Sequence, residues 1–295
     1  MSANYGQQAS EKSSNTCYRH PDRQSFVLCQ RCGRTICPEC QTQAPVGVLC
    51  PSCVREGQIP SRSVGRRVSS YMTSDKPVVT YTIIAICAVV YAIQWIGRPF
   101  GVTEALFYAP LHSFPEIFEP WRMITSMFSH SPTFFLHIVL NMFSLWIFGR
   151  ILESFLGKAR FIALFLVSGF AGSVMVMLSG YISQQYALTP VVGASGAIFG
   201  LMGAFLVIQK KLGSNVRQLL VLLVINFGIT FLPGVNISWQ AHVGGFVGGL
   251  VIGAIYLYTR KPSQKWLQVG LVSLWAVVLI LLSLSFWVLP VNTFW

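Results

Sequence analysis

Long apolar runs separated by short polar segments dominate the chain after residue 77. Residues 78–97 carry no charge, and a membrane-spanning helix needs about 20 such residues at 1.5 Å each. Of the later uncharged runs, 161–209 and 218–259 are too long for one crossing, and each is broken by a polar or Pro-Gly segment. The pattern predicts seven helices, at roughly residues 78–97, 133–150, 160–180, 194–210, 217–233, 240–259 and 267–289.

Composition supports a membrane protein. Hydrophobic residues make up 53% of the chain and charged residues only 10%, which is far from the composition of a soluble globular domain. The fold class expected is therefore an all-α polytopic membrane protein that lies in a lipid bilayer.

Positive charge gathers in alternate linkers of this pattern. The linkers before the first helix and after the second, fourth and sixth hold most of the Lys and Arg residues: Arg62, Arg66, Arg67, Lys76, Arg150, Lys158, Arg160, Lys210, Lys211, Arg217, Arg260, Lys261 and Lys265. Because such loops stay in the cytoplasm, the amino terminus is predicted inside and the carboxyl terminus outside, in a bacterial plasma membrane. The net charge of +12 then reflects orientation, and no nucleic-acid partner is expected. A polar segment precedes the first apolar run, so no secretory signal peptide is predicted.

The polar segment before the helices contains metal-ligand pairs. Each pair has the i, i+3 spacing with which a tight turn aims two ligands at one ion, and the members are Cys17, His20, Cys29, Cys32, Cys37, Cys40, Cys50 and Cys53. Disulfides are disfavoured because the segment is predicted to be cytoplasmic and one pair contains a His. We expect two structural zinc ions whose binding supplies the folding energy, since the apolar core is small: Phe26, Val27, Leu28, Ile36, Val46, Val48 and Leu49.

The ligand spacing resembles small zinc modules of the B-box and RING kind. That resemblance implies crossed pairing, in which the first and third pairs share one ion and the second and fourth share the other; sequential pairing stays open. It also implies an interaction or scaffold role, so the module is a candidate binding site for a cytoplasmic protein.

Four polar residues fall near the outer ends of the predicted helices. His137 and Asn141 lie early in the second helix, Ser195 opens the fourth, and His242 opens the sixth. With alternating topology all four lie at similar depth, and polar groups inside membrane spans usually face the bundle interior and serve function. Interhelical hydrogen bonds that only hold the bundle together are the alternative for any one of them.

Ser195 and His242 suit the roles of nucleophile and base, because an imidazole can take the proton of a serine hydroxyl near neutral pH. No carboxylate is available for a triad, so catalysis would use a dyad. Phe199 follows Ser195 by four residues and shares its helix face, where it could orient the imidazole or simply pack in the core. An oxyanion could be bound by backbone amides at the start of the fourth helix and by the side chains of His137 and Asn141.

Glycines follow both members of the dyad. They permit close packing of the fourth helix on the sixth in small-xxx-small fashion, and they are Gly196, Gly200, Gly203, Gly244, Gly245, Gly248, Gly249 and Gly253.

At these residues the chain resembles the rhomboid family of intramembrane serine proteases. The matching elements, in the family's order, are Trp121-Arg122, His137-x-x-x-Asn141, Gly193-Ala194-Ser195-Gly196 with Gly200, and Ala241-His242-x-x-Gly245-x-x-x-Gly249. The resemblance implies Ser195 as nucleophile, His242 as base, and His137, Asn141 and the Ser195 amide around the oxyanion. It further implies single-span membrane proteins as substrates and no cofactor for catalysis. Phe199 stands where the family often has Tyr.

The predicted organisation combines these parts. It comprises a disordered amino terminus at 1–15, the zinc module at 16–56, a flexible basic linker at 57–76, a six-helix protease core at 77–259, and a seventh helix with a short tail at 260–295.

Two other functions compete with proteolysis. A catalytically silent relative that recognises transmembrane helices is disfavoured by the intact dyad, and a transporter or metal permease by the absence of a carboxylate-lined path. The membrane part has neither an aspartate pair for acid catalysis nor a His-Glu-x-x-His run for metal-dependent cleavage, so the sequence does not indicate another kind of intramembrane protease.

Overall fold

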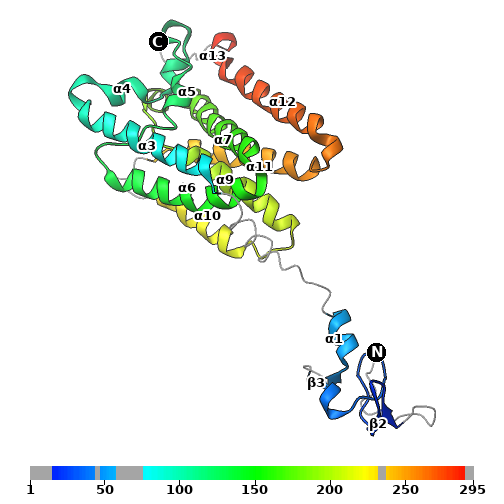
Figure 1. Cartoon of the computed structure of the whole chain (residues 1–295). Helices are drawn as coiled ribbons and strands as arrows, with labels where there is room; N and C mark the ends of the chain where they lie inside the picture. The colour runs from blue at the N-terminus through cyan, green and yellow to red at the C-terminus, as the bar shows by residue number, and fades with distance from the viewer. Residues whose placement is uncertain (1–14, 44–46, 58–75, 232–236, 290–295) are drawn as a thin grey trace. The chain divides into compact units, whose positions relative to one another are not determined.

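The computed structural model describes residues 15–43, 47–57, 76–231 and 237–289 (Figure 1). The chain forms two compact units, residues 1–65 and 66–295. Almost all of the segments predicted as a disordered amino terminus and a flexible linker lie outside the described residues, and these two predictions stay untested.

The first unit is small and built from short elements. Its strands form two antiparallel hairpins, β1 with β2 and β3 with β4. The elements are β1 (Thr16–Cys17), β2 (His20–Gln24), η1 (Pro38–Cys40), β3 (Thr42–Gln43), β4 (Val48–Leu49) and α1 (Pro51–Gly57).

The core of this unit consists mainly of cysteines. Six Cys side chains are buried together with Ile36. Phe26 is 71% exposed and Val27 41%, so their prediction as core residues is wrong. Val46, also expected there, lies outside the described residues. A segment whose interior is thiol has little hydrophobic burial to stabilise it, which agrees with a fold that depends on metal.

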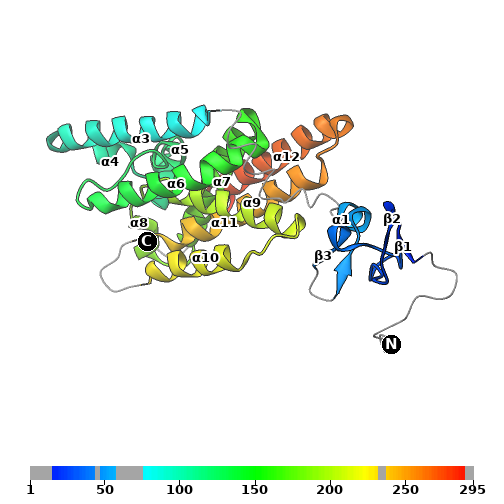
Figure 2. The same cartoon turned by 60° about the horizontal axis from the view of Figure 1, so that its bottom comes forward.

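The second unit is a helical bundle in which each of the seven predicted apolar segments contains a helix (Figures 1 and 2). The long helices are α3 (Val78–Ile96), α6 (Phe135–Leu156), α7 (Lys158–Ser179), α9 (Ser195–Lys211), α10 (Arg217–Ile229), α11 (Trp239–Tyr258) and α12 (Lys265–Ser283). Shorter elements between them are η2 (Arg98–Phe100), α4 (Val102–Leu106), η3 (Pro110–Ser113), η4 (Pro115–Ile117), α5 (Arg122–Thr125), α8 (Gln184–Leu188), η5 (Pro262–Gln264) and α13 (Ser285–Val288).

Five of these helices, α3, α6, α7, α11 and the segment Pro262–Ser283 that holds α12, are long and apolar enough to cross a membrane. At 17 residues α9 is about 25 Å long, and α10 has 13 residues. Most of α9 is buried because it packs on α11, α7 and α6 at the centre of the bundle, where Figures 1 and 2 show it. A helix enclosed by protein need not match the thickness of the bilayer by itself.

The second helix is longer than predicted, and the third starts earlier. Arg150, expected in a linker, lies inside α6 with its guanidinium 4.7 Å from the ring centroid of Trp146, one turn earlier. Through this contact the aromatic ring stabilises the charge of Arg150, so the helix can continue past this residue. Gly157, with φ of +82°, alone joins α6 to α7.

Glu153 closes the end of the bundle that holds the start of α3. Its buried carboxylate accepts hydrogen bonds from the backbone amides of Val79 and Thr80 at 2.9 and 2.7 Å, and from the Thr80 hydroxyl at 2.7 Å. The first amides of a helix have no intrahelical acceptor, and they form the positive end of its dipole. Glu153 on α6 thus serves as a cap for a different helix.

Candidate functional site

The close approach of α9 and α11 brings the predicted dyad helices together. An added Cβ at Gly245 would overlap the backbone of Gly196, and one at Gly249 would overlap that of Gly200. The two pairs advance together along both helices, so α9 and α11 run in parallel with their backbones in direct contact. The predicted small-xxx-small packing is confirmed. Ser195 immediately precedes the first contact and His242 precedes it by three residues, so both lie at the same end of the pair.

His242 lies in a buried setting with one nitrogen free. The residue is 4% exposed, and its ring stacks on Phe199 with the ring centroids 4.1 Å apart and the planes at 13°. Among the described residues, Nε2 of His242 has no hydrogen-bond partner. Nδ1 lies 3.4 Å from the hydroxyl oxygen of Thr230. A buried imidazole nitrogen without a partner is costly in a purely structural role and is what a general base requires.

The Gly193 segment brings His137 beside the start of α9. Gly193 has φ of +123°, and its amide donates to the carbonyl of Ser126 at 2.9 Å. A Cβ at this position would lie 2.8 Å from Nε2 of His137. Only glycine therefore permits both the backbone conformation and the contact with the imidazole. The structure thus places the His137 ring next to the residues that lead into Ser195.

Asn141 lies one turn after His137 and is buried. Its Nδ2 donates to the carbonyl of His137 at 2.8 Å, while Oδ1 has no partner among the residues described. One hydrogen of the amide remains for another acceptor.

His130 is buried beside this group. Its ring centroid lies 5.3 Å from that of His137, and both of its ring nitrogens lack partners in the described part of the chain.

Trp121 and Arg122 belong to the long segment between α3 and α6. Arg122 pairs with Glu119 and donates to the carbonyl oxygens of Glu104 and Phe107, at 2.6 and 3.2 Å. One guanidinium thereby ties the end of α4 to the chain at Glu119, whereas Trp121 is 55% exposed. Arg122 therefore supports this segment, and the supporting role expected of Trp121 stays a prediction.

The Cys and His pairs of the first unit form two clusters. One contains Cys17, His20, Cys37 and Cys40, and the other Cys29, Cys32, Cys50 and Cys53; in each, the ligand atoms lie within 4.8 Å of one another. This is the crossed arrangement, and the sequential pairing is wrong. Each cluster could hold a metal ion.

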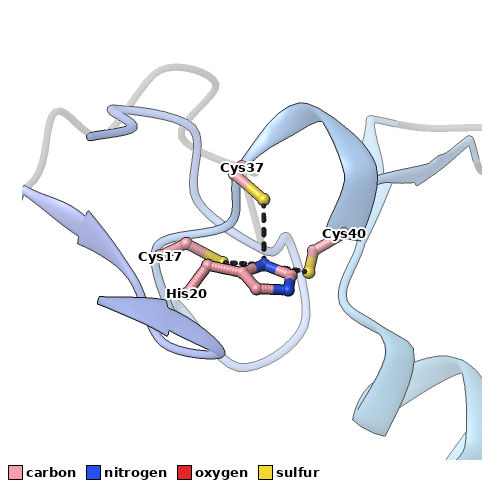
Figure 3. A group of neighbouring side chains, drawn as sticks. All are labelled: Cys17, His20, Cys37 and Cys40. Carbon is pink, nitrogen blue, oxygen red and sulfur yellow. Dashed lines mark hydrogen bonds between the residues drawn. The ribbon is translucent and has the colours of Figure 1, made fainter. Parts of the chain in front are cut away.

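In the first cluster Nδ1 of His20 faces the three sulfurs (Figure 3). It lies 3.8, 3.3 and 3.5 Å from the Sγ atoms of Cys17, Cys37 and Cys40. Tetrahedral zinc with bonds of about 2.0–2.3 Å separates its ligand atoms by roughly 3.3–3.8 Å. The residues therefore fit such an ion with Nδ1 as the histidine ligand.

Charge in the clusters also favours a cation. Burial and the neighbouring Cys17 and Cys37 thiols raise the pKa of Cys40 to about 11. Burial and the nearby Cys32, Cys50 and Cys29 thiols raise that of Cys53 to about 12. Additional thiolates thus cost free energy in the metal-free protein, and a bound dication would offset that cost.

Comparison with known proteins decides the family. The model of the Rhomboid domain matches residues 118–259, which contain all the residues grouped around His242. A putative rhomboid protease, YdcA of Bacillus subtilis, is 30% identical over 152 residues, which cover 50% of this chain and 72% of YdcA. The chain belongs to the rhomboid family.

Other rhomboids are similar over shorter parts of their length. RHOMBOID-like protein 6, mitochondrial, of Arabidopsis thaliana is 37% identical over 50% of this chain and 47% of its own length. Rhomboid protease GluP of Bacillus subtilis is 31% identical over 61% of this chain and 35% of its own length. The chain thus spans about half or less of these relatives. The Rhomboid match begins at residue 118 and leaves the Cys/His unit outside it.

Proposed function

We propose that this chain is an intramembrane serine protease that cleaves transmembrane segments with Ser195 and His242. The observation that carries the proposal is the state of His242, a buried imidazole stacked on Phe199 with Nε2 unpartnered among the described residues. Phe199 lies one helical turn after Ser195 on α9. The names of two relatives support the same activity: rhomboid protease GluP and putative rhomboid protease YdcA.

In the proposed reaction Nε2 of His242 takes the hydroxyl proton of Ser195 as Oγ bonds to the carbonyl carbon of the scissile peptide. The carbonyl π electrons move to its oxygen. When the tetrahedral intermediate collapses, the C–N bond breaks and the imidazolium protonates the departing amine. Water then attacks the acyl-serine with His242 as base again. No metal or cofactor takes part in this scheme.

The oxyanion would be bound by donors around Ser195. The Ser131 amide donates to Nδ1 of His137 at 3.4 Å, which leaves the ring proton on Nε2, the nitrogen next to Gly193. Nε2–H of His137, the free hydrogen of Asn141 Nδ2 and the backbone amide of Ser195 would then be the donors. Each such donor is worth about 10²–10³ in rate in known hydrolases.

Labelling with a fluorophosphonate tests the nucleophile in one gel. Wild-type protein should label and cleave a single-span membrane protein in vesicles, and Ser195→Ala should do neither. His242→Ala should lower cleavage by at least about 10²-fold because the base is lost. Ser179→Ala, which removes another buried serine hydroxyl at the end of α7, should keep full activity. Wild-type cleavage by Ser195→Ala would contradict the mechanism.

The proposed setting is a bacterial plasma membrane with the amino terminus in the cytoplasm and the carboxyl terminus outside. Support comes from the Lys and Arg residues at the starts of α7, α10 and α12 and at the ends of α9 and α11. In this orientation Ser195 and His242 lie toward the outer face. The partners proposed are single-span membrane proteins as substrates and the surrounding lipid, with no nucleic acid.

For the first unit we propose two structural zinc ions in a module at residues 16–56, followed by the protease core at 77–259 and the seventh helix at 260–295. All four ligands of each ion come from the protein, which leaves no position for a reactive water. The module is proposed to bind a cytoplasmic protein partner. Removing it should leave the dyad intact.

A further inference from the structure

A dyad leaves the orientation of its imidazole unexplained. In a serine triad a carboxylate holds Nδ1–H, so that Nε2 faces the nucleophile without a proton. The acid within the long helices described here is Glu153, which binds the start of α3 near the opposite end of α6 from His137. Stacking on Phe199 fixes the plane of the His242 ring, yet it does not determine which nitrogen carries the proton.

Thr230 is the side chain that meets the other nitrogen. It follows α10 directly, and its hydroxyl oxygen lies 3.4 Å from Nδ1 of His242. Thr230 is 6% exposed and His242 is 4% exposed, so water does not replace this contact freely. Hydrogen bonds in the free form of an enzyme are often long and shorten when the substrate binds.

The same hydroxyl has a second partner. Its oxygen lies 3.5 Å from the carbonyl oxygen of Asn226, one turn earlier in α10. A carbonyl can only accept, whereas a hydroxyl has one proton to give and two lone pairs to receive with. Donation from Thr230 to Asn226 therefore leaves the hydroxyl oxygen as an acceptor toward Nδ1 of His242.

The opposite proton arrangement has a cost. If Thr230 donated to Nδ1, the ring proton would be on Nε2, where it would find no acceptor among the described residues. A buried donor without a partner is unfavourable. With the proton on Nδ1, the lone pair of Nε2 is free to take a proton, which the proposed role of His242 as base for Ser195 requires.

We propose that Thr230 is a positioning residue that holds His242 in its Nδ1–H tautomer, with the hydroxyl in the place of a carboxylate. The proposal rests on the proposed proteolytic function, because it explains how His242 is prepared as a base. It makes α10 a supporting element of the site although neither member of the dyad lies on it.

Three variants test the proposal by kinetics. Thr230→Val keeps the shape but removes the hydroxyl, and kcat for a single-span substrate should fall about tenfold, or about 1.4 kcal/mol on the barrier, with KM unchanged. Thr230→Ser retains the hydroxyl and should restore kcat to within about twofold of wild type. The matched control is Thr259→Val, which removes a buried hydroxyl at the far end of α11 and should keep the wild-type kcat.

A spectroscopic readout separates positioning from packing. In protein labelled with ¹⁵N-histidine, the nitrogen shifts show which ring nitrogen carries the proton, and His242→Ala assigns the signal. Wild type and Thr230→Ser should show the Nδ1–H form, whereas Thr230→Val should show a mixture of tautomers. Melting temperatures in detergent check that each variant is folded.

Several outcomes would overturn the proposal: an Nε2–H form in the wild type, an unchanged tautomer or kcat in Thr230→Val, or an equal loss in Thr230→Ser and Thr230→Val. The failure of proteolysis itself looks different. A wild type that neither labels with fluorophosphonate nor cleaves would refute the proposed function, while its ¹⁵N spectrum would still test the contact between Thr230 and His242.

Discussion

The contact between α9 and α11 gives the most quantitative prediction. In Gly249→Ala the new Cβ would lie 2.5 Å from both C and Cα of Gly200, and closer still to the carbonyl oxygen. Ordinary contacts of a Cβ begin at 3.4 Å, so the helices must separate by at least about 0.9 Å. Backbone cannot rotate away as a flexible side chain can.

Overpacking of a filled core costs about 1–3 kcal/mol, and a backbone obstacle places this site at the upper end. Alanine regains about 1 kcal/mol of helix propensity over glycine. The net loss expected is about 2 kcal/mol. For a unit of this size it lowers the melting temperature by about 4–8 °C. The same displacement moves Ser195 relative to His242, and a misplacement of about 1 Å can cost about 10²-fold in rate.

Thermal unfolding followed by circular dichroism in detergent micelles measures the first effect, and the cleavage assay the second. The control is Gly270→Ala on the exposed side of α12, where an added Cβ meets nothing within 4 Å. That variant should be as stable as wild type or up to about 1 kcal/mol more stable. If Gly249→Ala melts at the same temperature as Gly270→Ala and cleaves at the wild-type rate, the predicted effect of the helix contact is refuted.

Two further predictions concern other parts of the chain. Glu153→Gln places an amide where a carboxylate accepts three hydrogen bonds. We therefore expect the free energy of unfolding to fall by about 2 kcal/mol, while the tautomer of His242 stays unchanged. An unchanged stability would contradict the capping role. Chelation should unfold the first unit while peptidase activity remains, and elemental analysis should find two zinc ions per chain. Because zinc binds thiolates and the raised pKa values of Cys40 and Cys53 keep these two thiols protonated in the metal-free clusters, zinc affinity should fall as pH falls. Affinity independent of pH would contradict thiolate ligation.

The pattern of hydrophobic and polar residues predicted the helices better than the segments between them. Uncharged runs of sufficient length identify a membrane helix because the bilayer demands internal hydrogen bonding and apolar side chains. The segment between α3 and α6 is held by contacts such as those of Arg122, which binds carbonyls far from it in sequence. No local pattern reports which carbonyls a guanidinium will reach.

The same limit applies to polar residues of the helices. His137, Ser195 and His242 could be predicted to share one depth, since each lies near the start of an apolar run. The sequence around Thr230 does not indicate a role in the site, because a lone threonine near the end of a helix commonly forms a hydrogen bond to its own backbone. Only the fold shows that its hydroxyl meets Nδ1 of His242. The role of Glu153 as a cap for α3 likewise depends on the packed bundle, because its hydrogen-bond donors lie more than 70 residues earlier in the chain.

There is a physical reason why an acidic residue lies at the start of α3 while a threonine lies beside His242. A carboxylate within a membrane protein is expensive unless several donors surround it, and Glu153 has three at the start of α3. Beside His242 a carboxylate would have a single donor and the aromatic face of Phe199 nearby, so its charge would be poorly compensated. A threonine hydroxyl can hold the imidazole without bringing a charge into the site. In the proposed mechanism the resting site then stays neutral, and charge would appear only when His242 takes the serine proton, as the oxyanion forms beside His137 and Asn141.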